Sequence, residues 1–93
     1  MRVQLAPELI SKVKKQDVRI RKKFKRAIGL FSKDPNNLEL NNHQLKREWK
    51  GFRSINITSD KRAVFEEINE GDDPVAYFIE LGTHNELYGK PKI

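Results

Sequence analysis

The spacing of apolar residues changes part-way along the chain, and this change restricts the possible folds more than any other feature. In the first third, apolar residues recur at steps of three and four, the spacing of an amphipathic helix: Leu9, Val13, Ile20, Phe24, Ile28 and Phe31. Pro7 suits the first turn of a helix, and Asp17 suits a helix N-cap. We therefore predict a hairpin of two helices over residues 7–15 and 17–32, with one long helix as the alternative.

The second half of the chain has the two-residue period of β-strands. Residues 54–58 alternate strictly between polar and apolar side chains, and residues 62–68 and 75–81 form the next two runs. A tight turn at residues 59–61 and a strong turn signal at residues 70–74 separate them. Turns this short force neighbouring strands to pair antiparallel.

These patterns together predict an α+β fold. The N-terminal helical hairpin packs on a three- to four-stranded antiparallel sheet, in two layers. Residues 2–5 are a candidate first strand, residues 38–50 are a polar connection, and residues 85–88 form a short C-terminal helix. A length of 93 residues predicts one domain, spanning residues 1–93.

The alternation within the strands predicts two different faces of the sheet. If Ile55 and Ile57 face the helices, then the alternate residues of that strand face the other way. In the next strand, Ala63 and Phe65 would likewise face the helices, and their neighbours would face the other way. The open face would then carry Ser54, Asn56, Thr58, Asp60, Arg62, Val64 and Glu66. We predict that this face is polar and available for binding.

Composition narrows the cellular setting and the possible partners. The chain has no cysteine, which rules out disulfides and thiolate zinc sites and suits a reducing cytoplasm. It shows no signal peptide and no apolar run approaching the ~20 residues of a membrane span, so we expect a cytoplasmic protein without a membrane partner.

Charge is distributed unevenly along the chain, for a formal net charge of +6. Residues 12–26 hold nine Lys and Arg side chains and one carboxylate, Asp17, whereas carboxylates concentrate from Glu66 onward. Such asymmetry predicts a polyanion or an acidic protein as partner. A solvated helix face with no partner is the alternative.

Residues 43–53, HQLKREWKGFR, resemble the H-x-L-x-x-x-W-x-G-[YF]-R segment of the RelE/YafQ toxins. Asp60, the strand at 62–68 and the ending LGTHNELYG at 81–89 extend the resemblance in order, so that it covers about half the chain in motif detail. It implies a messenger RNA interferase of a type II toxin–antitoxin pair, usually acting at the ribosomal A site. It also implies an acidic antitoxin partner and neither metal nor cofactor.

RNA cleavage without a metal needs a base for the 2′-hydroxyl, an acid for the departing 5′-oxygen and cations for the phosphate. Histidine suits proton transfer, and the chain has only His43 and His84. The resemblance implies His84 as general acid, because it closes the G-T-H motif. His43 is the predicted general base, with Asp60 as its rival or orienting partner. A surface histidine that caps the terminal helix is the structural alternative for His84.

The remaining site residues follow from the same resemblance. Arg62 corresponds to a catalytic arginine of RelE, and Tyr88 to an aromatic residue that stacks on the substrate base or else anchors the terminal helix. Arg53 and Lys61 are predicted phosphate contacts. Asn56 stands where YafQ-type toxins carry another histidine, and it can bind RNA but cannot exchange protons near neutral pH. We interpret Trp49 as structural.

Three other functions compete with this reading. A ParE-like inhibitor of DNA gyrase would share the fold, but that subfamily lacks these histidines. A non-catalytic nucleic-acid-binding domain would use the basic helices, although no zinc-finger, P-loop or RNP motif is present. Metal-dependent hydrolysis is the weakest option, since no carboxylates and histidines have convincing ligand spacing.

Overall fold

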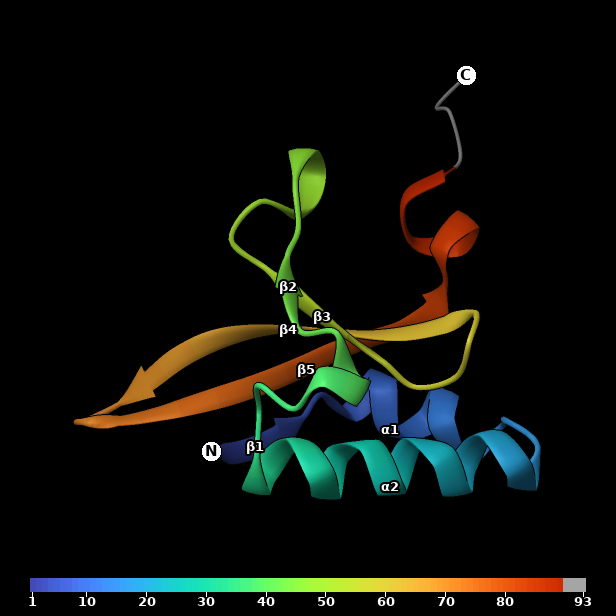
Figure 1. The fold of residues 1–93 in the computed structure, drawn as a ribbon, viewed down its shortest axis with the longest axis horizontal. Helices are drawn as coiled ribbons and strands as arrows, with labels where there is room; N and C mark the ends of the chain where they lie inside the picture. The colour runs from blue at the N-terminus through green and yellow to red at the C-terminus, as the bar shows by residue number, and fades with distance from the viewer. Residues whose placement is uncertain (90–93) are drawn as a thin grey trace.

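Two helices cover one face of a five-stranded sheet in the computed structural model, which describes residues 1–89 (Figure 1). Helix α1 spans Pro7–Lys14 and α2 spans Val18–Lys33, which confirms the predicted hairpin. Pro7 is the first residue of α1. Asp17 is the N-cap of α2, and its side chain accepts a hydrogen bond from the backbone N–H of Ile20.

The sheet has the strand order β1-β5-β4-β3-β2. The strands are β1 Arg2–Leu5, β2 His43–Gln44, β3 Arg53–Asn56, β4 Lys61–Glu70 and β5 Asp73–Thr83. The predicted antiparallel meander is confirmed in β3, β4 and β5.

The strand count and the all-antiparallel arrangement were predicted wrongly. β1 pairs parallel with β5, which is possible because the helical hairpin separates β1 from the other strands in sequence. β2 adds a fifth strand within the segment predicted to be only a polar connection, and it pairs with β3.

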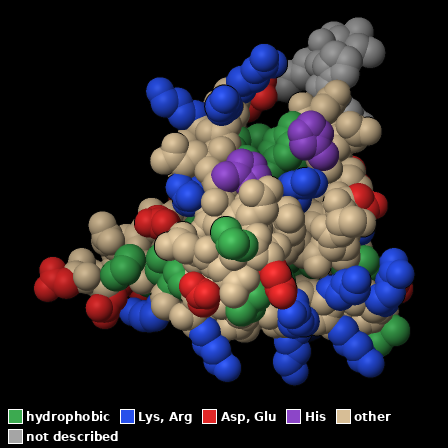
Figure 2. All heavy atoms as spheres, in the orientation of Figure 1, with side chains coloured by type: hydrophobic (Ala, Val, Ile, Leu, Met, Phe, Trp, Pro, Cys, Tyr) green, Lys and Arg blue, Asp and Glu red, His purple; other side chains and the backbone are tan. Residues whose placement is uncertain are grey.

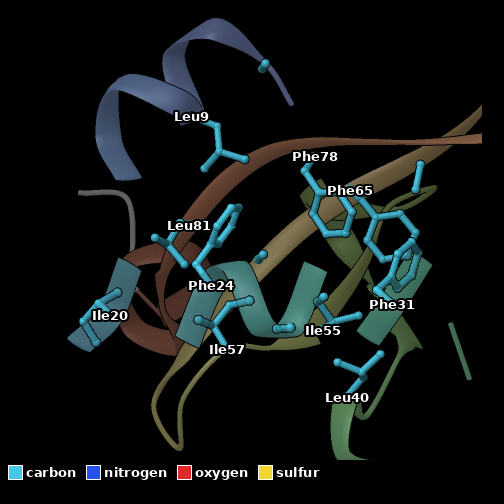
Figure 3. Packing of buried hydrophobic residues seen from close by; sticks show 14 residues of the cluster. Leu9, Ile20, Phe24, Phe31, Leu40, Ile55, Ile57, Phe65, Phe78 and Leu81 are labelled. Atoms are coloured by element: carbon cyan, nitrogen blue, oxygen red, sulfur yellow. The ribbon is translucent and has the colours of Figure 1, made fainter. Parts of the chain in front are cut away.

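The hydrophobic core lies between the helices and the sheet. Phe31 of α2 packs edge-on against Phe65 of β4 and Phe78 of β5, with ring centroids 5.0 and 5.3 Å apart. All three side chains are fully buried. Figure 3 shows Leu9 of α1 and Phe24 of α2 directed towards the same cluster.

The predicted strand parity is confirmed, but part of the opposite face is not available for binding. Ile55 and Phe65 belong to the core on the helix side. Ser54 and Val64, which pair with each other and have the opposite parity, are fully buried as well. The β2–β3 connection and the C-terminal turn rise from that side of the sheet (Figure 1), so it is not the uniformly open surface that alternation alone predicted.

Three short helical turns complete the described residues: η1 Leu38–Leu40, η2 Arg47–Trp49 and η3 Asn85–Gly89. η3 corresponds to the predicted C-terminal helix, and its five residues have π-helical hydrogen bonding. Within residues 1–89, no helix combines the length and the apolar character that a membrane crossing requires.

Candidate active site

Four of the predicted site residues line one pocket, of 520 Å³: His43, Arg62, His84 and Tyr88. They come from β2, from β4, from the end of β5 and from η3. The β2–β3 connection and η3 supply the two walls of this pocket, and Arg62 of β4 completes its lining. Both segments rise from the same side of the sheet (Figure 1). Figure 2 shows both histidine side chains on one face of the molecule, with hydrophobic side chains between them.

His43 has a defined ring orientation. Its Nδ1 lies 2.8 Å from the backbone oxygen of Asn41. A carbonyl oxygen can only accept a hydrogen bond, so Nδ1 donates in this contact. In the neutral ring the proton therefore resides on Nδ1, and Nε2 retains the free lone pair. Asn41 adopts a left-handed backbone with φ 46°, a conformation that asparagine tolerates better than most residues.

Thr83 and Glu86, on either side of His84, form a capping box. The Thr83 hydroxyl accepts from the Glu86 backbone N–H at 3.1 Å, and the Glu86 carboxylate accepts from the Thr83 backbone N–H at 2.7 Å. The backbone hydrogen bond from Thr83, then the contact with its hydroxyl, lowers the pKa of Glu86 below its ordinary value of 4.5. These two residues, and not His84, make the cap. His84 is exposed, and its ring packs edge-on against Tyr88 with centroids 4.9 Å apart.

Trp49 joins the two walls of the pocket. Its Nε1–H donates to the backbone oxygen of Leu87 in η3 at 2.9 Å. Its ring also packs edge-on against Phe52 and Tyr88, with centroids 5.5 and 6.5 Å apart. Trp49 is therefore structural, as predicted, but it packs against the terminal turn in addition to its own loop. It holds the segment that carries His43 against the segment that carries His84.

Arg62 lies opposite Gly82 across the β4–β5 pair. A Cβ atom at position 82 would lie 3.3 Å from the Cβ of Glu86 and 3.4 Å from a methyl carbon of Leu87. The glycine thus lets η3 fold back closely over the end of β5. This close approach brings the terminal turn beside the strand that carries Arg62.

The other predicted site residues lie outside this pocket. Asp60 is exposed in the β3–β4 turn and accepts a hydrogen bond from the Thr58 hydroxyl at 2.8 Å. Lys61 approaches Glu86 at 3.9 Å. Arg53 donates from Nε to the side chain of Asn42 and lines a neighbouring pocket. Asn56 lines a third pocket, beside α2, and pairs with Arg62 across β3 and β4, but it is not among the residues that line the histidine pocket.

Two features of the pocket were missed from the sequence. Lys46 and Arg47 also line it, and Arg47 has a positive φ of 59°, which is uncommon for a residue with a side chain. The adjacent cations Lys46 and Arg47 could have been recognised in the sequence as further candidates for binding phosphate. The Thr-x-x-Glu spacing at 83–86 was a readable signal for the capping box.

Three buried polar atoms on the side of the sheet opposite the helices have no hydrogen-bond partner among the described residues. Within residues 1–89 these are Ser54 Oγ, Asn56 Oδ1 and the Tyr88 hydroxyl. Of the three residues, only Tyr88 lines the histidine pocket. Its hydroxyl can still donate and accept hydrogen bonds there. The same described range contains no group of three or more His, Asp or Glu side chains placed to hold a metal ion.

Comparison with protein-family models and with curated protein sequences found no match for this chain. Solved structures do match. A YoeB/ParE toxin from Agrobacterium tumefaciens is 20% identical, with 90% of this chain and 99% of that chain covered and a TM-score of 0.71. YafQ from E. coli strain BL21(DE3) is 22% identical, with 96% and 100% covered and a TM-score of 0.71.

The RelB-RelE antitoxin-toxin complex from Methanococcus jannaschii also matches, at 20% identity, with 90% of this chain and 93% of that chain covered and a TM-score of 0.62. At sequence identities this low, structural similarity establishes the architecture alone. This is the fold that the sequence resemblance implied, and the chain has the fold of the RelE, YafQ and YoeB/ParE toxins.

Proposed function

We propose that this protein is the toxin of a type II toxin–antitoxin system and cleaves messenger RNA without a metal ion. The observation that carries the proposal is the single pocket lined by His43, Arg62, His84 and Tyr88. Two imidazoles and a guanidinium can supply the base, the acid and the cation that metal-free phosphodiester cleavage requires.

His43 is the proposed general base. Its Nδ1 is occupied by the Asn41 carbonyl, so the free lone pair of Nε2 is available to take the proton from the 2′-hydroxyl. The 2′-oxygen then attacks phosphorus and forms a 2′,3′-cyclic phosphate. Asp60, the rival base, hydrogen-bonds to Thr58 in a turn outside the pocket, and this favours His43.

His84 is the proposed general acid and protonates the 5′-oxygen as the bond between phosphorus and that oxygen breaks. Tyr88 packs against the His84 ring, so the aromatic residue orients the acid as well as offering a surface for a base. Arg62, with Lys46 and Arg47, stabilises the charge on the phosphate. Asn56 does not line this pocket, and in the proposal cations take the place of the family's additional histidine.

The solved relatives support the biological setting. Several of them are toxin–antitoxin complexes, among them DinJ-YafQ from E. coli and RelB-RelE. In this protein residues 19–26 of α2 expose six cations suited to an acidic antitoxin: Arg19, Arg21, Lys22, Lys23, Lys25 and Arg26. We propose such an antitoxin as partner, the ribosomal A site as the place of cleavage and the cytoplasm as the compartment. Because the attraction is electrostatic, 1 M salt is expected to weaken antitoxin binding markedly.

The test is to incubate the purified protein with programmed ribosomes, and with free messenger RNA, in the presence of a chelator. The upstream RNA fragment of each cleavage should carry a 2′,3′-cyclic phosphate at its 3′ end. His84→Gln and His43→Gln are each expected to lower the cleavage rate by about 100-fold or more. Antitoxin binding and circular dichroism check that these variants fold.

Asp60→Asn is the matched control, because it alters the rival base outside the pocket and should retain most of the activity. Full activity in His43→Gln together with loss in Asp60→Asn would reverse the assignment of the base. Intact RNA with inhibited DNA gyrase would identify the ParE-like function instead. RNA that binds but stays intact, with and without ribosomes, would identify a non-catalytic binding domain.

A further inference from the structure

A second pocket, of 580 Å³, lies on the other side of the loop that walls the histidine pocket. The two pockets share the loop residues Gln44, Leu45, Lys46 and Arg47. This loop is therefore a ridge with one pocket on each side. An RNA strand that crosses it would occupy both pockets with successive nucleotides.

The second pocket is strongly cationic. Its lining includes Lys46, Arg47, Lys50 and Arg53, and within residues 1–89 none of these four side chains forms an ion pair. Arg53 instead donates to the neutral side chain of Asn42. Figure 2 shows Lys and Arg side chains gathered at the top of the face that carries both histidines. Four cations against one carboxylate leave the lining with excess positive charge, and a bound phosphate would reduce the repulsion among the cations.

The same pocket has an apolar part on which a base can lie. Leu45 and Phe52 are half-buried and line it. Phe52 is held by its edge-on contact with Trp49, 5.5 Å between centroids. Arg47, at the shared ridge, has a left-handed backbone, a costly conformation that is concentrated at functional sites in proteins.

Glu67 of β4 is the only carboxylate among the residues that line the second pocket. It is exposed, and no ion pair with another residue of the described chain neutralises it. An ionised carboxylate only accepts hydrogen bonds, as it does from the exocyclic amino group of cytosine. At the position of that amino group uracil carries a carbonyl oxygen, which would face the carboxylate unfavourably.

We propose that the second pocket binds the nucleotide next to the cleaved linkage and that Glu67 makes it select against uracil there. The inference rests on the proposed function, since it requires RNA in the histidine pocket. It goes further by assigning a second binding site and the base preference that the site imposes.

The test uses RNA trinucleotides with methylated 2′-hydroxyls, which bind but cannot be cleaved. The central nucleotide is kept constant, and both flanking nucleotides are either cytidine or uridine. Fluorescence anisotropy should show the wild-type protein favouring cytidine by about fivefold. Glu67→Gln should reduce this preference to less than about twofold, because an amide can also donate to uracil.

Glu66→Gln is the matched control, since it removes the same charge at the next position of β4 without altering the lining of either pocket. It should retain the preference. Lys50→Gln should weaken cytidine and uridine probes equally and lower the salt dependence of binding by about one counterion. A preference that survives Glu67→Gln, or is lost in Glu66→Gln, would overturn the inference.

The outcome separates this inference from the nuclease proposal. If cytidine-selective binding depends on Glu67 but natural RNA stays intact, the second site stands and the nuclease proposal fails. If RNA is cleaved and Glu67→Gln leaves the flanking preference unchanged, the nuclease stands and the second site fails. If no trinucleotide binds, the second site is refuted.

Discussion

The two sides of the sheet differ in whether their buried side chains all have packing or hydrogen-bond partners. On the helix side, Phe31, Phe65 and Phe78 are fully buried and pack ring against ring. On the opposite side, Ser54 and Tyr88 retain buried hydroxyls without partners in the described residues. A buried polar group without a partner costs about 1–3 kcal/mol. The first side therefore maintains the fold, whereas on the second side the hydroxyl of Tyr88, which lines the histidine pocket, retains unused hydrogen-bonding capacity.

Phe31→Ala tests the helix side and has the largest expected effect. It removes the ring that contacts both other phenylalanines, and should lower the free energy of unfolding by about 3–5 kcal/mol. Urea denaturation measures the change. Leu38→Ala is the control, because that side chain is 95% exposed and its loss should change stability by less than about 0.5 kcal/mol. Equal losses in the two variants would contradict this account of the core.

Trp49→Phe tests whether the opposite side is organised for function. The substitution keeps an aromatic ring but removes the hydrogen bond to the Leu87 oxygen, at a cost in stability of about 1 kcal/mol. RNA cleavage should fall about tenfold, because small displacements of catalytic groups are costly. Tyr77→Phe, which removes a hydroxyl outside the pocket, should leave cleavage unchanged. Unaltered cleavage in Trp49→Phe would restrict Trp49 to a role in folding.

Glu86→Gln tests the capping box beside His84, with a smaller expected effect. The hydrogen bonds from Thr83 lower the pKa of Glu86, so the folded protein favours the charged form. The resulting stabilisation is present above the ordinary pKa of 4.5 and is lost as pH falls through the lower folded-state value. Wild type and Glu86→Gln should thus differ in unfolding free energy at pH 7 and converge at low pH.

A Glu86→Gln effect that persists unchanged at low pH would show that the carboxylate charge is irrelevant to the cap.

Ser54→Ala has the smallest expected effect and tests whether the unpartnered hydroxyl contributes to folding. Removing it should change stability by less than about 1 kcal/mol or increase it. Thr58→Val is the contrast, because the Thr58 hydroxyl accepts from the Lys61 backbone N–H and donates to Asp60, so its loss should cost about 1–2 kcal/mol. A larger cost for Ser54→Ala would indicate an internal partner for that hydroxyl.

Local signals in the sequence determined the helices and the inward-facing side of the strands. Residues 7–15 and 17–32 were predicted as helices, and the structure has Pro7–Lys14 and Val18–Lys33. Apolar period, proline position and an N-cap act within a few residues, so they can be recognised without knowing the rest of the fold. The same holds for Ile55, whose burial follows from alternation alone.

Only the tertiary structure decided which strands pair at a distance and which polar residues share a pocket. The parallel β1–β5 pair and the Trp49–Leu87 hydrogen bond join segments far apart in the chain. Alternation placed Asn56 and Arg62 on the same face, and they pair across β3 and β4, but only Arg62 lines the histidine pocket. Closing a long loop has an entropic cost, which contacts along the entire sheet must compensate. Which distant segments meet therefore depends on how the whole chain packs. The sequence therefore determined the residue types of the candidate site, and the packing of the sheet decided which of them lie together.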